Sequence, residues 1–476
     1  MINSAKTKIL ATLGPAVNNE EKIKELVKAG ISGVRFNFSH SDYEIFKQMH
    51  AAVEKVSADT KKSISILLDL GGPKIRTGEM SEPEILIKTG ETIEITTEDV
   101  VGTKDLISTS YKSLPQDSNI GDKIMIDDGL LHLRIIEKKE KSVVCKIETG
   151  GLLKRRKGMN LPGMKLSTPS VTKKDFSDLE FALNYRIDYI ALSFVREAND
   201  IIDLRKWLEN KGHGDISIIA KIEKDEAVRN FEKILYHSDG IMVARGDLGV
   251  EMHPQDVPII QKNIIRRCNE LGKPVITATQ MLDSMIHNPM PTRAEASDVA
   301  NAVLDGTDVV MLSGETSVGA HPALTVQTME NILIRTESNF HLKKKIKFDI
   351  PTKFDVNILD AFARSISRIA EQTEAASILC FTRTGTTAQM ISKFRPGCPV
   401  FAVTNRKETF NKLALRWGVI PLFFEQMIDV DTTIIDVLEL MKSMNAVSKN
   451  DLVIVTSGQP YSDELRENNL RFELVK

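Results

Sequence analysis

The chain has 476 residues, of which 42% are hydrophobic and 27% charged, a composition that supports large buried cores and favours two to four domains. Its formal net charge of -2 excludes the strong basic field expected of a protein that binds nucleic acid or an anionic membrane surface. Because its four cysteines are scattered and it has neither a signal peptide nor an apolar run of roughly 18 residues, we expect a soluble cytoplasmic protein without disulfides, structural zinc or a membrane span.

The first two-thirds of the chain repeat one pattern, in which a short apolar run ends in polar or glycine residues and leads into an amphipathic helix. Predicted strands cover residues 8–14, 33–39, 64–70, 189–195, 217–223, 240–247, 274–281 and 308–315. Predicted helices between them include residues 20–29, 42–55, 175–184 and 258–271. Continuous apolar strands joined by helices are typical of a parallel sheet covered on both faces, and eight such units favour a closed (β/α)8 barrel, the TIM barrel.

The helical pattern stops after the third strand, between a hinge at residues 71–73 and a second hinge at residues 161–163. Alternating apolar and polar stretches replace it, at residues 84–87, 92–96, 123–126, 130–136 and 142–147. Asp128-Gly129 predicts a hairpin turn. Because this β-rich insertion leaves a strand-to-helix loop, we expect it on the catalytic face as a lid, with a merely decorative domain as the alternative. The basic run at residues 154–157 favours a lid, since its cations would reach a polyphosphate.

A third unit begins after residue 345, with a predicted helix at 357–371. Its predicted strands cover residues 377–382, 399–404, 419–424 and 451–456. The loop 382–387 leaves a strand and opens a helix, so its backbone N–H groups and hydroxyls predict an anion site for an effector phosphate, with a plain helix cap as the alternative. The resulting domain limits are 1–71 with 164–344 for the barrel, 72–163 for the lid and 345–476 for a C-terminal α/β domain.

Polar side chains gather at the predicted carboxyl ends of the barrel strands, where TIM barrels hold their active sites. They are Arg35, Asn37, Ser39, Asp69, Lys221, Glu223, Asp247, Thr279, Gln280, Ser313 and Glu315. Lys221 and Glu223 are two residues apart and therefore project from the same face of one strand. Together with Asp247 after the next strand, they suit a divalent cation with an anionic ligand bound against it. Buried ion pairs are the alternative, but buried charges are costly and cluster at functional sites.

The chain resembles the pyruvate kinase family from end to end. The matching segments are 7–15 (TKILATLGP), 35–40 (RFNFSH), 72–78 (GPKIRTG), 127–129 (DDG), 157–163 (KGMNLPG), 220–223 (AKIE), 244–249 (ARGDLG), 277–282 (TATQML) and 311–316 (MLSGET). The resemblance implies transfer of a phosphoryl group from phosphoenolpyruvate to ADP, giving pyruvate and ATP in the last step of glycolysis. Glu223 and Asp247 would hold Mg2+ or Mn2+. Lys221 and Arg35 would bind the transferring phosphoryl group and offset its negative charge.

The resemblance also implies how the substrates are held. The substrate carboxylate would be bound by Thr279 and by a tight backbone turn made of Ala244, Arg245, Gly246 and Asp247. Thr279 and Ser313, with ordered water, would be the candidates for protonating the enolate. Contacts to the nucleotide are implied for Arg76, Lys157, Asn37 and His40.

One segment departs from the pattern of the many family members that need a monovalent cation. The resemblance places that cation at Asn37, Ser39, Asp69 and the carbonyl of Leu70. In those members the segment reads Asp-Thr-Lys-Gly-Pro-Glu, whereas residues 69–74 of this chain read Asp-Leu-Gly-Gly-Pro-Lys. The ammonium of Lys74 would act as a tethered monovalent cation, so we expect that K+ is not required.

Regulation and assembly are also implied by the resemblance. The family's sugar-bisphosphate loop is partly matched by Thr382, Thr384, Gly385, Thr386 and Thr387, while residues 457–466 lack the glycine-rich run often found there. We therefore expect a different effector, such as a nucleotide or a sugar monophosphate, or none. The family is usually homotetrameric.

Two other functions compete with this interpretation. A metal-dependent lyase or aldolase acting on pyruvate or phosphoenolpyruvate would also use paired carboxylates and Mg2+, but it has no second polyphosphate for Arg76 and Lys157 to bind. A catalytically silent metabolite sensor would require the loss of a catalytic residue, and the chain retains Lys221, Glu223 and Asp247.

Overall fold

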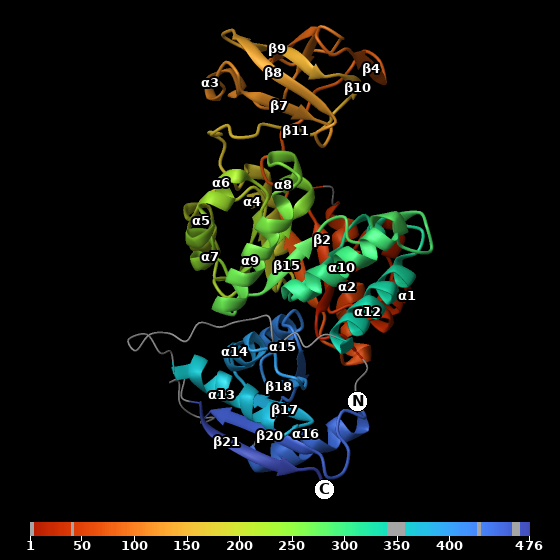
Figure 1. Ribbon diagram of the computed structural model, residues 1–476, viewed down its shortest axis with the longest axis vertical. Coiled ribbons are helices and arrows are strands. Elements are labelled where there is room, and N and C mark those ends of the chain that lie inside the picture. The colour runs from red at the N-terminus through yellow and green to blue at the C-terminus, as the bar shows by residue number, and fades with distance from the viewer. Residues whose placement is uncertain (1–3, 40–41, 340–357, 426–429, 459–466) are drawn as a thin grey trace.

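The computed structural model describes residues 4–39, 42–339, 358–425, 430–458 and 467–476. Within these residues, eight parallel strands close into a barrel in the order β1-β16-β15-β14-β13-β12-β3-β2. Their bounds are β1 Lys8–Thr12, β2 Gly33–Asn37, β3 Ser65–Asp69, β12 Tyr189–Leu192, β13 Ser217–Ile222, β14 Gly240–Ala244, β15 Val275–Ala278 and β16 Val309–Leu312. The predicted TIM barrel is confirmed, and Figure 1 shows it in the middle of the molecule.

The barrel strands end earlier than the sequence pattern predicted. β14 stops at Ala244, which is also its last residue in register with β15. The prediction that this strand runs to Asp247 is wrong, because residues 245–247 form the first turn of helix α8 (Arg245–Glu251). Where the hydrogen-bonded ladder ends, the next backbone N–H groups are free to begin a helix. Residues 245–247 therefore begin a helix at the barrel mouth instead of extending a strand.

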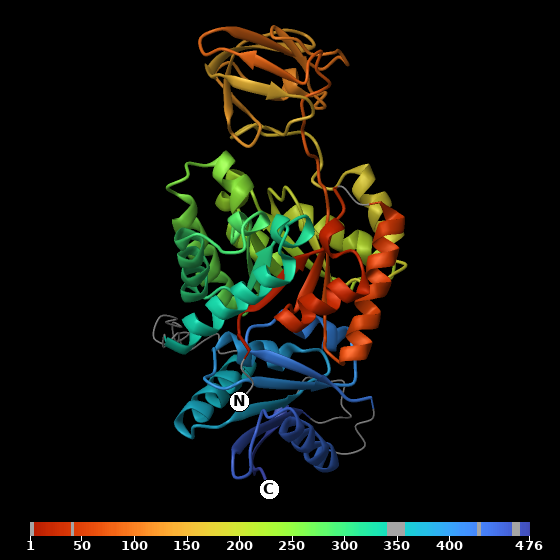
Figure 2. The same ribbon diagram turned by 90° about the vertical axis from the view of Figure 1, so that its right-hand side faces the viewer.

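Helices cover the outside of the barrel (Figures 1 and 2). They include α1 (Glu20–Ala29), α2 (Tyr43–Thr60), α4 (Lys173–Ala182), α5 (Ala198–Asn210), α7 (Phe231–His237), α9 (Val257–Leu271), α10 (Arg293–Asp305) and α12 (Pro322–Asn339). Local sequence sets their ends: the Asn19 side chain caps α1 by accepting from the Lys22 N–H at 3.0 Å, and Gly272 ends α9 with a φ of 67°. Of the helices in the described ranges, none has the length and apolar character that crossing a membrane requires.

The inside of the barrel is filled by inward-pointing side chains of the barrel strands. This inner cluster contains Leu10, Leu67, Tyr189, Ala191, Ile219, Met242, Ile276, Ala278, Val309, Met311 and Leu415. All but the last come from the barrel strands. Leu415 belongs to the C-terminal part of the chain, and its Cδ2 lies 3.1 Å from the position that a Cβ on Gly33 would occupy. A C-terminal residue therefore closes the amino-terminal end of the barrel.

The insertion after β3 is a separate β-rich body with its own hydrophobic core. A six-stranded sheet runs in the order β11-β7-β8-β9-β5-β6, beside a two-stranded sheet of β10 and β4. The bounds are β4 Glu84–Ile87, β5 Thr92–Thr96, β6 Leu106–Ser108, β7 Lys123–Ile126, β8 Leu131–Lys138, β9 Ser142–Thr149, β10 Gly151–Lys154 and β11 Met159–Asn160. The predicted hairpin is present, because the Leu130 N–H donates to the Asp127 carbonyl and Gly129 has a φ of 84°.

The C-terminal residues form an α/β domain around a five-stranded sheet of order β19-β18-β17-β20-β21. The bounds are α13 Ile358–Gln372, β17 Ser377–Phe381, α14 Thr386–Lys393, β18 Val400–Thr404, α15 Lys407–Leu413, β19 Val419–Phe423, α16 Val430–Ser443, β20 Leu452–Gly458 and β21 Glu467–Leu474. Two hydrophobic clusters lie against this sheet. Figures 1 and 2 show the insertion at one end of the molecule and the C-terminal domain at the other.

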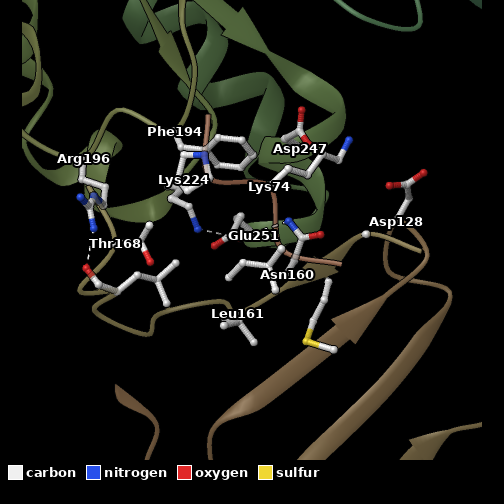
Figure 3. A pocket seen from close by; sticks show the side chains of 15 residues that line it. Lys74, Asp128, Asn160, Leu161, Thr168, Phe194, Arg196, Lys224, Asp247 and Glu251 are labelled. Carbon is white, nitrogen blue, oxygen red and sulfur yellow. Dashed lines mark hydrogen bonds and ion pairs between the residues drawn. The ribbon is translucent and has the colours of Figure 1, made fainter. Parts of the chain in front are cut away.

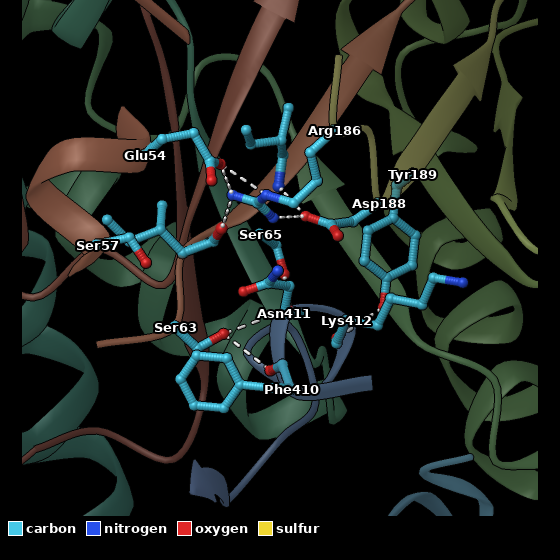
Figure 4. A network of polar contacts seen from close by, with 12 residues as sticks. Glu54, Ser57, Ser63, Ser65, Arg186, Asp188, Tyr189, Phe410, Asn411 and Lys412 are labelled. Atoms are coloured by element: carbon cyan, nitrogen blue, oxygen red, sulfur yellow. Dashed lines mark hydrogen bonds and ion pairs between the residues drawn. The ribbon is translucent and has the colours of Figure 1, made fainter. Parts of the chain in front are cut away.

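Barrel hydroxyls hold the end of helix α15 at the interface between the barrel and the C-terminal domain (Figure 4). Ser63 Oγ donates to the Phe410 carbonyl at 2.8 Å, and the Tyr189 hydroxyl donates to the Lys412 carbonyl at 2.8 Å. The last carbonyls of a helix have no partner within that helix. The barrel therefore completes the end of α15, and this pairing fixes how the two domains dock.

Candidate active site at the mouth of the barrel

One lysine at the end of β13 is surrounded by acceptors that lie at the ends of β3, β12 and β13 itself. Lys221 Nζ lies 2.8 Å from the Glu223 carboxylate, 3.2 Å from the Asp69 carboxylate and 2.7 Å from Ser193 Oγ. The side chains of Asp69 and Glu223 are only 1% and 2% exposed. Sequence analysis placed Asp69, Lys221 and Glu223 among the polar residues at the strand ends, and the structure brings these three side chains into contact.

The surrounding charges keep these groups ionised. Burial works to lower the pKa of Lys221, but the carboxylates of Asp69 and Glu223 outweigh it and hold that pKa above its ordinary value. Burial likewise works to raise the pKa of Asp69, but Lys221 and Arg35 hold it below its ordinary value. Arg35 Nε donates to Asp69 at 2.7 Å, and its Nη1 donates to Thr12 Oγ1 at 3.1 Å. The Lys221 ammonium and the Arg35 guanidinium therefore both pair with the Asp69 carboxylate. Both are groups suited to binding a phosphoryl oxyanion.

Two carboxylates from neighbouring elements lie close together here. Glu223 follows β13 and accepts from the Phe194 N–H at 2.8 Å. Burial and then the nearby Glu223 raise the pKa of Asp247 to about 6, while Lys221 and Lys74 work to lower it. A divalent cation would relieve this repulsion, and carboxylate oxygens are the ligands that Mg2+ prefers. The pair therefore fits such a cation, although no group of three or more His, Cys, Asp or Glu side chains with metal-binding geometry occurs among the described residues.

Thr279 lies just beyond β15 in a strained backbone segment. The φ angles of Thr279 and Gln280 are 69° and 52°, in the left-handed region that residues with a side chain rarely adopt. The Gly246 N–H donates to Thr279 Oγ1 at 2.9 Å, which joins this segment to the first turn of α8. The Arg245 guanidinium donates to the Thr279 carbonyl at 2.6 Å and pairs with Asp298 at 2.7 Å. These contacts hold the strained conformation.

The tight turn predicted for residues 244–247 is not present, because the chain enters α8 directly after Ala244. Gly246 has no positive φ, and a Cβ placed on it would make only an ordinary contact of 3.6 Å with Thr279 Oγ1. Neither conformation nor space therefore requires a glycine at position 246.

Ser313 lies at the end of β16 and is not bonded to Thr279. Its N–H donates to Glu315 Oε2 at 2.7 Å, and Glu315 also accepts from the Leu282 N–H at 3.2 Å. Thr279 Oγ1 donates to the Ala278 carbonyl at 2.6 Å. Since no hydrogen bond joins the two hydroxyls within the described residues, a proton relay between them would need water.

The lid residues Arg76 and Lys157 are tied to the lid itself. Arg76 Nη1 donates to the Arg156 carbonyl at 3.2 Å, and Lys157 Nζ pairs with Asp127 at 2.8 Å. Within the described residues, neither side chain contacts Lys221, Asp69 or Glu223. The structure therefore does not bring these two predicted nucleotide contacts together with the predicted catalytic groups.

A cavity of about 580 Å³, including its opening to solvent, separates the lid hinges from the barrel mouth (Figure 3). Its lining includes Lys74, Asp128, Asn160, Leu161, Thr168, Phe194, Arg196, Lys224, Asp247 and Glu251. The buried Glu251 carboxylate pairs with Lys224 at 3.2 Å and accepts from the Asn160 amide at 3.3 Å. One carboxylate on α8 therefore joins a lid hinge to the barrel.

The residues predicted for a monovalent cation are engaged in contacts of their own. Asn37 Oδ1 accepts from the Ser39 N–H at 3.2 Å, and the Leu70 carbonyl accepts from Ser193 Oγ at 2.7 Å. His40, predicted to contact the nucleotide, lies outside the described residues.

Lys74 is exposed and lies in the lining of the cavity, next to Asp247 (Figure 3). Its positive charge is close enough to lower the pKa of Asp247, which opposes the effect of burial. The positive charge of Lys74 therefore lies near Asp247, a predicted Mg2+ ligand.

The predicted effector loop folds into a compact turn ahead of α14. The Gly385 N–H donates to Thr382 Oγ1 at 3.0 Å, and the hydroxyls of Thr384 and Thr386 lie 2.9 Å apart. Gly385 has a φ of 88°, which explains a glycine at this position. Thr387 is buried in the first turn of the helix.

Sequence reasoning missed Ser193, Lys224 and Glu251. Ser193 is a polar residue near the end of the predicted strand 189–195, so the rule that identified Lys221 applies to it as well. Glu251 follows Asp247 by four residues, a spacing that places both on one face of a helix. Predicting a strand over residues 245–247 hides this signal.

Comparison with known proteins identifies the family. A family model described as pyruvate kinase, barrel domain, matches residues 4–326, and one described as pyruvate kinase, alpha/beta domain, matches residues 360–471. The chain belongs to the pyruvate kinase family. It is 43% identical to the pyruvate kinases of Staphylococcus saprophyticus over 472 residues and Geobacillus stearothermophilus over 475 residues, covering 99% of this chain and 80% of each relative. The crystal structure of a pyruvate kinase from Cryptosporidium parvum matches with a TM-score of 0.93 and 37% identity, covering 100% of this chain and 97% of that one.

Membership in the pyruvate kinase family makes the chain a phosphotransferase with the family's glycolytic role. The resemblance stated from the sequence motifs is confirmed. Pyruvate kinases need a divalent metal, and the Glu223 and Asp247 carboxylates are suitable ligands for one.

Proposed function

We propose that the chain transfers the phosphoryl group of phosphoenolpyruvate to ADP in the cytoplasm, using Mg2+ or Mn2+ and without a requirement for K+. The observation that carries this proposal is Lys221, which is fixed between the carboxylates of Asp69 and Glu223 at the barrel mouth. A positioned charge of this kind stabilises the transition state of phosphoryl transfer without having to reorganise during the reaction.

In this proposal the cations act on the transferring phosphoryl group. Glu223 and Asp247 hold the divalent metal, which neutralises charge on the substrate oxygens when bound. The Lys221 ammonium lies along the phosphoryl group, and the Arg35 guanidinium binds it from a second side. Because Asp69 pairs with both cations, it holds them in position to stabilise negative charge without transferring protons.

The carboxylate of phosphoenolpyruvate is held by the backbone of residues 244–247 and by the Thr279 hydroxyl. Thr279 already accepts from the Gly246 N–H, so its hydroxyl oxygen is positioned next to this backbone. We assign protonation of the enolate to Thr279 and Ser313 through ordered water, since hydroxyl groups of high pKa relay protons and do not supply them.

ADP binds beneath the lid in this proposal, contacted by Arg76 and Lys157 from the lid and by Asn37 and His40 from the barrel. The ion pair between Lys157 and Asp127 is partly exposed, with the lysine side chain 35% accessible. Such a pair contributes little stability, so Lys157 can exchange Asp127 for ADP phosphates as the lid closes.

Independence from K+ rests on Lys74, whose ammonium lies near Asp247 at the barrel mouth. We expect Lys74→Glu to remove this tethered charge and create a requirement for K+, with activity in a bulky organic cation falling at least about tenfold and returning when K+ is added. Steady-state rates in both salts measure the effect, and Lys88→Glu, an exposed lysine elsewhere in the lid, is the matched control. A variant that is equally active in both salts contradicts this role for Lys74.

The first test of the whole proposal is pyruvate formation from phosphoenolpyruvate, ADP and Mg2+, with no monovalent cation except a bulky organic one, and then with K+ added. Equal activity in both is the expected result. Activity only with K+ would support the kinase function and contradict the role proposed for Lys74. Pyruvate release without ADP would favour a lyase, and no activity from folded protein would favour a metabolite sensor.

Several features of the organisation are part of the same proposal. The domain limits are 1–71 with 164–344, 72–163 and 345–476. We propose a homotetramer, and an effector bearing a phosphate at the loop 382–387. The turn formed by Thr382 and Gly385 supports that site, because it leads directly into α14.

A further inference from the structure

A second cavity lies at the opposite end of the barrel from the active site, between the barrel and the C-terminal domain. Its volume, including its opening to solvent, is about 240 Å³. It forms where the end of α9 and the start of β15 meet the end of α14, and Figure 1 shows α9 and α14 facing each other across the domain boundary. Gln389 on α14 donates to the Gly272 carbonyl at 2.7 Å and so helps to fix this boundary.

The lining of this cavity is strongly cationic. It includes Lys273 from the barrel and Lys393, Arg395 and Arg416 from the C-terminal domain. Asp308, the carboxylate in the lining, pairs with Arg395 at 2.8 Å, and Lys393 pairs with Asp360. Lys273 donates to three backbone carbonyls, which occupy its hydrogens without neutralising its charge. Since no ion pair of Lys273 or Arg416 is found within the described residues, the cavity keeps an excess of positive charge.

Arg395 contributes buried donors that have no acceptor. Its side chain is 4% exposed, and its acceptors all gather on one nitrogen. Nη2 donates to Asn269 Oδ1 at 2.9 Å and to the Gly306 carbonyl at 2.7 Å, and it also pairs with Asp308. Nε and Nη1 of Arg395 and Nη1 of Arg416 are buried without a hydrogen-bond partner in the described residues. Buried donors without acceptors are rare because their lost hydration is not replaced.

We propose that this cavity binds a small oxyanion, a phosphate or carboxylate group, between the barrel and the C-terminal domain. Guanidinium groups present their N–H donors in a planar fork that matches the oxygens of such anions. The anion would be held by Arg395 and Arg416 from one domain beside the charge of Lys273 from the other, so its binding would strengthen the docking of the two domains. The loop 382–387 precedes α14, whereas this cavity lies at the other end of that helix, so the two sites are distinct.

Crystals of the full chain soaked in selenate would locate the site directly, because selenium scatters anomalously and selenate has the shape of sulfate and phosphate. We expect an anomalous peak in the cavity, with oxygens within hydrogen-bonding distance of Arg395 and Arg416. Selenate bound only at the barrel mouth or at the loop 382–387, with nothing but water in the cavity, would overturn the proposal.

Calorimetry with inorganic phosphate and, separately, with acetate would identify the anion class and test the two arginines. Arg416→Gln removes one guanidinium, and Arg395→Lys keeps a cation able to pair with Asp308 while removing Nε and Nη1. We expect each variant to lose at least about tenfold in affinity for the anion that binds the cavity, as expected for a lost charged hydrogen bond. The exposed Arg368 in the C-terminal domain supplies the control Arg368→Gln, which should bind as the unmodified chain does.

Sensitivity to phosphate alone would identify a phosphate ligand, and sensitivity to acetate alone a carboxylate ligand. We also expect phosphate to bind at the barrel mouth. The part of the binding heat that disappears in the variants is therefore the part that comes from binding in the cavity. If one variant fails to fold, the other variant and the selenate soak still test the proposal. Unchanged binding in a folded variant would contradict the proposal.

Discussion

At the scale of single residues, the barrel mouth depends on how burial and ion pairing oppose each other. Lys221 is buried, which by itself would favour its neutral form, yet Asp69 and Glu223 keep it charged. Removing one partner from such a cluster leaves an uncompensated buried charge. The same arrangement that fixes the Lys221 ammonium therefore also makes the cluster sensitive to substitution.

We expect Lys221→Met to lower kcat by about a hundredfold to a thousandfold, while the protein still binds phosphoenolpyruvate. The reason is that the variant loses a positive charge that is needed mainly in the transition state. Steady-state kinetics and a separate measurement of substrate binding check both parts. Lys206→Met, at an exposed position on α5, is the control. If kcat survives in folded Lys221→Met, the role given to this lysine is wrong.

A second residue-scale prediction concerns Asp188, which is 1% exposed near the docked end of α15 (Figure 4). Burial raises the pKa of Asp188 from 3.8 to about 6, against the opposing influence of Arg186 and of the Ile66 N–H. Between about pH 4 and 6 the folded protein therefore holds a proton that the unfolded chain releases. The stability from this group is present at the acidic end of that window and is lost as pH rises through 6.

The loss over the whole window amounts to about 3 kcal/mol, from about two pKa units. Asp188→Asn should remove this dependence, because an amide does not titrate there. Urea unfolding of both proteins between pH 4.5 and 7.5 would show the stability of the unmodified chain falling relative to the variant as pH rises. A constant difference between the two proteins would show that Asp188 has an ordinary pKa.

At the scale of elements, the transition from strand to helix at the end of β14 positions the site. Because α8 begins at Arg245, Asp247 and Glu251 lie one turn apart on the same helix. Asp247 lies close to Glu223, whereas Glu251 is bound by Lys224 of the barrel and Asn160 of the lid. One short helix thus links the proposed metal ligand to the lid hinge.

We expect Asn160→Ala to raise the KM for ADP several-fold and to change the KM for phosphoenolpyruvate little. Loss of the hydrogen bond to Glu251, worth roughly 1 kcal/mol or more, would leave the lid less firmly oriented above the barrel, and ADP is the substrate assigned to the lid. Steady-state kinetics in each substrate measure the split. An equal rise in both KM values would mean that Asn160 supports the fold of the site and not the lid.

At the scale of the whole molecule, three bodies are stacked with the barrel between the other two (Figure 2). The C-terminal domain contributes to the barrel core through Leu415, which is 2% exposed and packs with residues of the inner cluster. Together with the hydroxyls that hold the end of α15, this contact couples the barrel to the domain proposed to carry the effector.

Leu415→Ala should leave a cavity at the closed end of the barrel and cost about 2–5 kcal/mol, as large-to-small core substitutions do. We expect the thermal midpoint to fall by several degrees and the barrel and C-terminal domain to unfold less cooperatively. Differential scanning calorimetry would show both effects. Leu324→Ala, at a half-exposed leucine on α12, should change the midpoint little, and an equal effect of the two substitutions would contradict the coupling through Leu415.

Sequence alone determined the features that rest on local pattern. Apolar runs followed by amphipathic helices predicted the eight-stranded barrel, alternation predicted the β-rich insertion, and nine ordered motifs predicted the family. Polar residues at strand ends also indicated Lys221 and Glu223, because period-two geometry and the closure of parallel strands leave little freedom for where such residues lie.

Tertiary structure alone decided the contacts that join segments far apart in the chain. The pairing of Glu251 with Asn160, the entry of Leu415 into the barrel and the unpartnered donors of Arg395 have no signature in local sequence. The end of β14 belongs with them, since the extent of its ladder with β15 decides where the helix carrying Asp247 begins. Local pattern encodes which face of an element is buried, but which partner buries it depends on the packing of the whole chain.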